Sequence, residues 1–198
     1  MLFGAYDADY ILIGGDVFND DAFNYLDIQL FSNKLKELKP SGKVYTVLGN
    51  HDPNSLDSRI YDFFKEANIN LLVDYIIELK DFYIVGRDDI TSNPNRETLT
   101  SLLKNINIKK PLIVLDHNPL GVNEAIENQV DILLCGHTHQ GQFFPATLFT
   151  KLSYGKISFY GYHQEKNTHI LVSSGIGYFQ MPMRIGTSSE VVLLNIRL

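Results

Sequence analysis

Four short runs of consecutive apolar residues stand out in the pattern of hydrophobic and polar positions along the chain. Runs of four or five residues are too short for a helix and are typical of strands buried on both faces. Strands of this kind belong to parallel sheets that are covered by helices. The four predicted strands are Tyr10 to Ile13, Val44 to Leu48, Leu112 to Leu115 and Ile132 to Cys135.

Amphipathic stretches separate these runs and predict helices. In the first stretch, apolar side chains recur at roughly helical spacing until a Pro-Ser-Gly sequence ends the predicted helix. Helices that alternate with continuously apolar strands favour an α/β domain with a mostly parallel sheet. The predicted helices lie within residues 22–39, 55–69, 96–108 and 122–130.

Two other parts of the chain predict strands without intervening helices. In residues 70–86, charged residues interrupt the apolar runs, as in antiparallel hairpins. Residues 156–174 and 188–198 also have the pattern of strands. We therefore expect a second, mixed sheet packed on the first, within a single domain that covers residues 1–198.

Composition and charge narrow the class of protein. The formal net charge of −6 and the pI of about 5.4 argue against a general nucleic-acid-binding surface. No apolar run approaches the roughly 18 residues of a membrane span, and the first residues lack the basic start of a signal peptide. Cys135 is the single cysteine, so no intrachain disulfide can form, and it is expected to be a small buried side chain. These features predict a cytoplasmic protein, or one associated with the cytoplasmic side of a membrane.

Each of the four predicted strands is followed by side chains that can bind metal ions. In open α/β sheets, ligands bind in the crevice outside the carboxyl ends of the strands. Glycine precedes these side chains in three of the four places, which lets the backbone turn sharply and approach an ion closely. Nitrogen and hard oxygen donors of this kind suit Zn, Mn or Fe. The residues that follow the strands are Asp16, Asn50, His51, Asp52, Asp116, His117, Asn118, His137 and His139.

The order of these motifs resembles a known family. Gly-Asp, Gly-Asn-His-Asp, a lone His and Gly-His-x-His occur in this order between Asp16 and His139. This series is similar to that of the calcineurin-like metallophosphoesterase superfamily. The resemblance implies an α/β fold of two packed mixed sheets flanked by helices, and two divalent metal ions, Mn, Zn or Fe.

The resemblance also implies which residues bind the two ions. Asp16 would bridge them, since one anion has to hold two cations. Asn50, His117 and His137 would complete the protein ligands of one ion. His139 would bind the other.

His51 is implied to be the catalytic histidine of the Gly-Asn-His motif, with Asp52 orienting it. The implied reaction is hydrolysis of a phosphodiester, pyrophosphate or phosphomonoester bond by a hydroxide that bridges the two ions. Protonated His51 would donate a proton to the leaving oxygen. The substrate would be a small-molecule or lipid-like phosphoester.

One motif of the family does not occur in this sequence. The family begins with Asp-x-His at the end of its first strand, and the chain contains no Asp-x-His. The first strand and helix of the family are therefore expected to be missing, and the domain to be N-terminally incomplete. Asp7 and Asp9 precede the second family strand and are interpreted as solvated acids. Three hypotheses follow: a fragment of a longer enzyme, an inactive domain that binds one metal, or a site completed by a partner chain.

The residues after the second motif histidine are similar to one subgroup, in which Gly-His-Thr-His-Gly-Gly-Gln precedes apolar residues and proline. Gln140 replaces the first of those glycines. Members often carry an N-terminal membrane anchor and act on envelope phosphodiesters or phospholipid-like substrates, which implies membrane association through an upstream segment. Phe143, Phe144, Leu148 and Phe149 either line an apolar groove for acyl chains or pack between the two sheets, and packing is the favoured interpretation.

Several other polar residues are given structural roles. Asp116 and Asn118 are expected to orient the histidine that lies between them. Arg184 could bind a substrate phosphate, but a structural hydrogen-bonding role is the favoured interpretation. His163 and His169 match no motif and are interpreted as surface or sheet residues.

Overall fold

The computed structural model describes residues 8–19, 21–107 and 109–197, which form two β-sheets. The smaller sheet contains three parallel strands in the order β1-β2-β3. The larger sheet has the order β4-β5-β6-β7-β9-β8, and only its edge strands β4 and β8 are antiparallel to their neighbours. The strands are β1 (Ile11–Ile13), β2 (Val44–Thr46), β3 (Asn70–Leu71), β4 (Tyr75–Glu78), β5 (Tyr83–Gly86), β6 (Leu112–Leu115), β7 (Ile132–Cys135), β8 (Gly161–Glu165) and β9 (Thr168–Val172).

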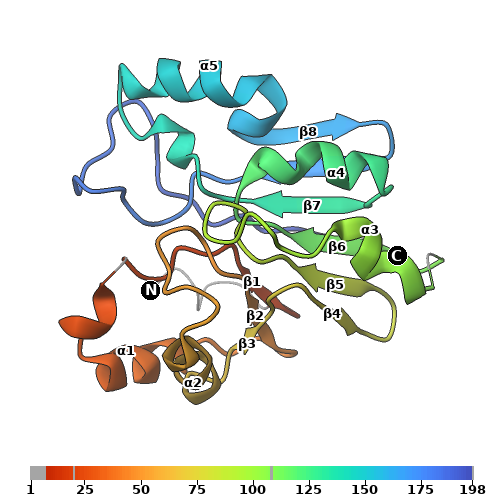
Figure 1. Ribbon diagram of the computed structural model, residues 1–198. Coiled ribbons are helices and arrows are strands. Elements are labelled where there is room, and N and C mark those ends of the chain that lie inside the picture. Colours follow the sequence, from red (N-terminus) through yellow and green to blue (C-terminus); the bar gives the residue numbers. More distant parts are fainter. Residues whose placement is uncertain (1–7, 20, 108, 198) are drawn as a thin grey trace.

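Helices lie outside both sheets (Figure 1). Helices α1 and α2 lie beside the smaller sheet, α3 and α4 lie beside the larger one, and α5 lies at the far end of the molecule. Side-chain oxygens of Asp27, Asp57 and Thr98 accept backbone N–H groups and so cap the first turns of α1, α2 and α3. The helices are α1 (Ile28–Leu35), α2 (Ser58–Glu66), α3 (Leu99–Leu102), α4 (Val122–Glu127) and α5 (Ala146–Phe159), with 3-10 turns η2 (Ala22–Asn24), η3 (Leu103–Asn105), η4 (Pro119–Gly121) and η5 (His139–Gly141).

Three clusters of buried apolar residues hold these layers together. One lies between the two sheets, and the other two lie between each sheet and its helices. Strand β6 shows how the sequence produces this arrangement, because Ile113 and Leu115 face the other sheet while Leu112 and Val114 face the helices. A strand that is buried on both faces has to be apolar at every position. The predicted α/β fold of two packed sheets flanked by helices is therefore confirmed.

The distribution of strands between the sheets differs from the prediction. The four apolar strands do not share one sheet, because β1 and β2 belong to the smaller sheet and β6 and β7 to the larger. Strands in both sheets have one face toward helices and one toward the other sheet, so the apolar pattern cannot tell the sheets apart. The prediction of a strand over residues 188–198 is wrong for residues 188–197, the part that the structure describes. These residues form no strand and are mostly exposed.

Helix α5 is the main feature that the sequence pattern does not predict. Residues 156–159, predicted to be part of a strand, form its end. The interpretation of Phe144, Leu148 and Phe149 as core residues is wrong, because they are 74%, 50% and 64% exposed. Among the helices of the described ranges, none combines the length and apolar character needed to span a bilayer.

Candidate metal centre

Asp16 and His117 connect the loop after β1 with the end of β6, and thus join the two sheets. The Nδ1 of His117 lies 2.6 Å from the carbonyl oxygen of Gly14. With Nδ1–H donating to this carbonyl, Nε2 is directed toward Asp16 and lies 3.1 Å from its Oδ2. Gly15 permits this approach, because its φ is +88° and a Cβ there would lie 2.8 Å from Nδ1 of His117. An imidazole whose other nitrogen is fixed by a carbonyl is typical of metal-binding histidines.

Asn50 and His137 make the second contact between the two sheets. The Oδ1 of Asn50, in the loop after β2, lies 2.7 Å from Nδ1 of His137, in the loop after β7. The other ring nitrogen of His137 lies 2.7 Å from the hydroxyl of Tyr154 in α5. The rings of His117 and His137 have centroids 5.2 Å apart, so the two contacts adjoin. Four of the predicted metal ligands therefore meet in one place.

Asp52 holds the loop that carries Asp16. Its Oδ2 accepts the backbone N–H groups of Asp16 and Gly49, both at 2.8 Å, and its Oδ1 accepts that of Phe18 at 2.8 Å. The N–H of His51 in turn donates to Oδ1 of Asp16 at 2.9 Å. Asp52 is therefore a buried anchor of the site backbone. Its implied role in orienting the imidazole of His51 stays a prediction.

Phe179, a residue that the sequence did not single out, lies against both His139 and His51. The ring of Phe179 is 6.3 Å from that of His139, in a stacked arrangement, and 5.4 Å from that of His51. The carbonyl of His139 accepts a hydrogen bond from Nη1 of Arg184 at 3.0 Å. The guanidinium of Arg184 also donates to several carbonyls in residues 174–177, which supports its predicted structural role.

Three of the predicted ligands have a left-handed backbone conformation. The φ angles are +53° at Asp16, +68° at His137 and +49° at His139. Non-glycine residues rarely adopt these angles, and such strain is concentrated at functional sites. The loops thus hold these side chains in directions that ordinary turns would not give.

The donor atoms fit a divalent cation by their chemistry, although they are paired with one another. In the described part of the chain, no three His, Cys, Asp or Glu side chains are arranged so that they could hold a metal ion. Asn50 is not one of those four residue types. A cation that binds here would have to enter between Asp16 and His117, and between Asn50 and His137. Nε2 of His117 lies 3.1 Å from Asp16 but outside hydrogen-bond geometry, and Nδ1 of His139 is buried without a hydrogen-bond partner. Metal coordination would satisfy both atoms.

Comparison with known proteins identifies the family. The sequence model of a family described as calcineurin-like phosphoesterase matches residues 2–141, which is more than half of the chain. The chain belongs to the calcineurin-like phosphoesterase family. The resemblance inferred from the motifs is thereby confirmed, and the chain joins a family whose members generally bind divalent metal ions.

Relatives of this phosphoesterase occur in bacteria and animals. A metallophosphoesterase of Helicobacter pylori is 31% identical over 195 residues, which cover 96% of this chain and 51% of that protein. A metallophosphoesterase of Aquifex aeolicus is 30% identical over 200 residues, which cover 96% of this chain and 73% of that protein. A transmembrane protein with metallophosphoesterase domain from Danio rerio is 27% identical over 199 residues, which cover 92% of this chain and 44% of that protein. The chain thus spans about half the length of the Helicobacter relative.

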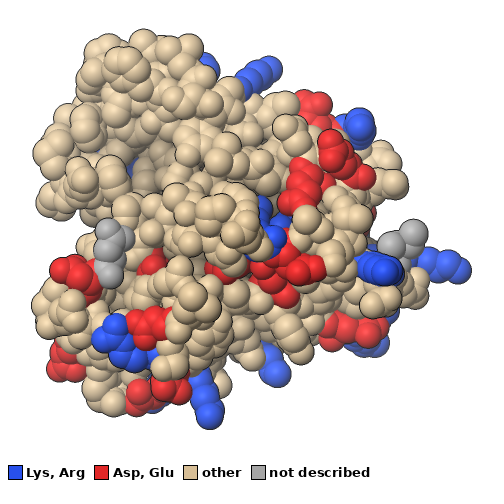
Figure 2. Space-filling view, viewed as in Figure 1, with Lys and Arg blue, Asp and Glu red and all other residues tan. Residues whose placement is uncertain are grey.

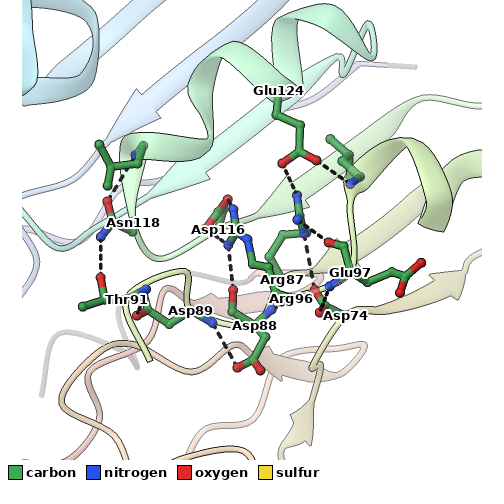
Figure 3. Close-up of polar contacts among 12 residues, drawn as sticks. Asp74, Arg87, Asp88, Asp89, Thr91, Arg96, Glu97, Asp116, Asn118 and Glu124 are labelled. Carbon is green, nitrogen blue, oxygen red and sulfur yellow. Dashed lines mark hydrogen bonds and ion pairs between the residues drawn. The ribbon is translucent and has the colours of Figure 1, made fainter. Parts of the chain in front are cut away.

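The side chains of Asp116 and Asn118 bind residues other than His117. Both oxygens of Asp116 bind the guanidinium of Arg96, at 2.8 and 2.7 Å, and this pair is buried (Figure 3). Asn118 donates to the hydroxyl of Thr91 and accepts the N–H of a residue in η4. The side chains of both residues are therefore engaged by other groups, and the structure does not support the expectation that they orient His117.

The remaining sequence-based assignments fall at the surface. Asp9 is exposed and accepts a hydrogen bond from Ser41, as expected of a solvated acid, whereas Asp7 lies outside the described residues. His163 and His169 lie on β8 and β9 at the outer edge of the larger sheet. Both are distinct from the site, as predicted.

Two residues of the site escaped the sequence analysis. Tyr154 had no recognisable signal, because the helix that carries it was not predicted. Asp89 had one, since it follows β5 in the sequence Gly-Arg-Asp-Asp, much as the other candidate residues follow their strands. Asp89 is fully buried, and its Oδ2 has no hydrogen-bond partner. Burial lowers the pKa of His137, and the charge of Asp89 is one of those that partly oppose this.

The electrostatics of the site favour neutral histidines beside a carboxylate. Burial lowers the pKa of His137 and of His139 to about 4, so both are neutral at pH 7 and able to bind a metal. Burial raises the pKa of Asp16, but the neighbouring His117 and the N–H of His51 outweigh it, and the pKa lies below its ordinary value. For His117, burial lowers the pKa and Asp16 raises it more strongly.

The metal-free chain is expected to lose stability as the pH falls from 7 to 5, partly through His137 and His139. Their pKa values are lower in the folded than in the unfolded chain, so unfolding takes up protons and acid favours it. Since both are partly exposed, we expect about 2 kcal/mol in total. Urea unfolding with a chelator present measures this. The pKa of His117 is raised, so this residue has the opposite effect on stability. The test is therefore a comparison with the double variant His137→Gln/His139→Gln, whose free energy of unfolding should fall less between pH 7 and pH 5. An equal loss in both proteins would contradict the prediction.

Proposed function

We propose that the chain is the catalytic part of a divalent-metal-dependent phosphoesterase that hydrolyses a phosphodiester or pyrophosphate bond. The observation that supports this is the meeting of Asp16, Asn50, His117 and His137 at loops from both sheets. All four supply the oxygen or nitrogen donors that Mn, Zn and Fe accept. The substrate is proposed to be a small-molecule or lipid-like phosphoester.

Bound divalent ions would neutralise charge on the phosphoryl oxygens and supply a nucleophile near neutral pH. The residues of the chain then have distinct tasks. Asp16 supplies the anionic oxygens, and Asp52 fixes the loop that carries it. His51 is tied to Asp16 through its N–H, and its imidazole would hold a proton for the leaving oxygen.

A second ion would need more ligands than the described residues offer. Of the ligands that the family motifs imply, His139 and the shared Asp16 remain for this ion, and two ligands make a weak site. We propose that a segment outside the described residues supplies the others in the complete protein. The greater length of the Helicobacter relative is compatible with such a segment.

Metal content and hydrolysis together test the proposed function. The chain is purified with Mn or Zn, its metal is counted by elemental mass spectrometry, and hydrolysis of bis(p-nitrophenyl) phosphate is followed. We expect bound metal, and hydrolysis that a chelator abolishes and added metal restores. The variant His137→Ala should lose the metal, whereas His163→Ala, a histidine on the outer strand β8, should keep it.

The outcomes separate the candidate functions. Hydrolysis that persists in excess chelator would contradict a metal-dependent enzyme, and a chain that binds no metal would contradict the site. One bound ion without hydrolysis would support a catalytically inactive domain that binds a single metal. The paucity of ligands for a second ion is the observation that favours this alternative.

A further inference from the structure

An exposed apolar face borders the metal centre. It consists of residues 144–152, which include the first half of α5, and residues 176–185. Phe144, Phe149 and Leu152 are 74%, 64% and 73% exposed, and six further large apolar side chains of residues 176–185 are at least 40% exposed. Exposed apolar side chains that gather on one surface mark a binding site, whereas single ones are ordinary.

The two segments of the apolar face are joined by buried polar contacts. Gln142 is 3% exposed, and its Nε2 donates to the carbonyls of Phe179 and Met181 at 2.9 and 3.0 Å. Its Oε1 accepts the N–H of Phe179 at 2.6 Å. Phe179 in turn lies against the rings of His139 and His51. The face is therefore a defined surface that reaches the site.

The charge around the apolar face is opposite to that of the chain as a whole. The two segments of the face, residues 144–152 and 176–185, contain Lys151 and Arg184 and no acidic residue, whereas the chain carries a net charge of −6. Lys151 and Lys156 are exposed on α5 itself. In Figure 2 the lobe that contains α5 is almost entirely uncharged, and blue side chains project from it.

We propose that the apolar face docks on the surface of an anionic lipid bilayer. Exposed Phe and Leu side chains together with nearby Lys are the groups by which protein surfaces bind the membrane interface. Each lysine near an anionic membrane strengthens binding. A second copy of the chain is a poorer occupant, because Lys151 and Lys156 of two such faces would repel one another. Docking would bring Phe179, and with it His139 and His51, to the level of the lipid headgroups. The proposal does not depend on the phosphoesterase activity.

A single introduced tryptophan reports docking directly, because the chain contains none. The variant Phe149→Trp keeps an aromatic side chain on the apolar face, and its fluorescence is measured while vesicles are added. Vesicles of phosphatidylcholine and phosphatidylglycerol in equal parts should shift its emission to shorter wavelength. The control Leu30→Trp, at a position 58% exposed on α1 beside the smaller sheet, should show no shift.

Co-sedimentation with the same vesicles separates the apolar from the electrostatic contribution. The double variant Phe149→Ser/Leu152→Ser should lower the partition coefficient at least about tenfold. Lys151→Glu/Lys156→Glu should also lower it at least about tenfold on anionic vesicles, and raised salt should weaken binding of the unaltered chain. The controls Leu30→Ser/Leu56→Ser and Lys65→Glu/Lys80→Glu change exposed side chains elsewhere and should bind as the unaltered chain does.

Each result decides for or against docking. Loss of binding in both apolar-face variants, with the controls unaffected, supports the proposal. No binding by the unaltered chain, or equal losses in variants and controls, overturns it. A chain that is dimeric in solution and becomes monomeric in Phe149→Ser/Leu152→Ser would show that a second copy covers the face, and would also overturn it. Because the altered side chains are exposed, urea unfolding should give similar midpoints for all variants.

Discussion

Replacement of Asp16 by asparagine is expected to lower metal-dependent hydrolysis at least about 10³-fold, which corresponds to roughly 4 kcal/mol of the activation barrier. The amide oxygen can still accept the N–H of His51, as Oδ1 of Asp16 does at 2.9 Å. The amide nitrogen can face Nε2 of His117 in place of Oδ2, so the loop should keep its conformation. What the variant loses is the negative charge that has to balance the cations.

The control for this prediction is Asp81→Asn, which makes the same change at an exposed position in the turn between β4 and β5. Initial rates of bis(p-nitrophenyl) phosphate hydrolysis, with metal in excess, are compared for the three proteins. Urea unfolding shows whether the variants remain folded. If Asp16→Asn kept more than a tenth of the activity while Asp81→Asn behaved as the unaltered chain, the central role of Asp16 would be wrong.

The candidate site was largely predictable because two strong patterns coincide in the sequence. A strand buried on both faces is apolar throughout, so the runs that became β1, β2, β6 and β7 were visible without any structure. Donor side chains directly after such runs must lie at the edge of a sheet, whichever sheet the strand joins. The meeting of Asp16 with His117 and of Asn50 with His137 followed from this, even though the strands were assigned to the wrong sheets.

Helix α5 was unpredictable for the opposite reason. Apolar residues of a periodic pattern are expected on the buried side of an element, but no residue of α5 is buried, and Leu148, Phe149 and Leu152 are exposed. The glycine at position 155, with φ +71°, interrupts the helix and disturbs its periodicity further. Tyr154, which contacts His137, was missed together with the helix that carries it. Apolar side chains that serve a surface cannot be distinguished from core residues by pattern alone.

Loss of the buried ion pair between Arg96 and Asp116 is expected to destabilise the fold more than any other change considered for this protein. The two side chains are 4% and 2% exposed and are joined by two hydrogen bonds, at 2.8 and 2.7 Å (Figure 3). The variant Arg96→Met leaves the carboxylate of Asp116 buried without its partner. Removal of one member of a buried pair typically costs about 3–5 kcal/mol. Urea unfolding at pH 7 measures the difference.

Arg59→Met is the matched control for the Arg96 variant. The guanidinium of Arg59 lies 2.7 Å from Asp57, as that of Arg96 does from Asp116, but the side chain of Arg59 is 61% exposed. An exposed pair contributes about 0–1 kcal/mol, so burial is the variable that the comparison isolates. Equal losses in the two variants would show that burial of the pair does not set its contribution.

The double variant Arg96→Met/Asp116→Leu should recover most of the lost stability, because it leaves no unpaired buried charge. A pH series provides an independent check of the same cause. Burial raises the pKa of Asp116, and Arg96 opposes this, so the carboxyl of Arg96→Met should take up a proton more readily when folded than when unfolded. Acid should then favour the folded state of that variant, and its deficit relative to the unaltered chain should shrink from pH 7 toward pH 5. A deficit that stays constant with pH, together with no recovery in the double variant, would mean that the loss comes from packing around Arg96 rather than from the charge of Asp116.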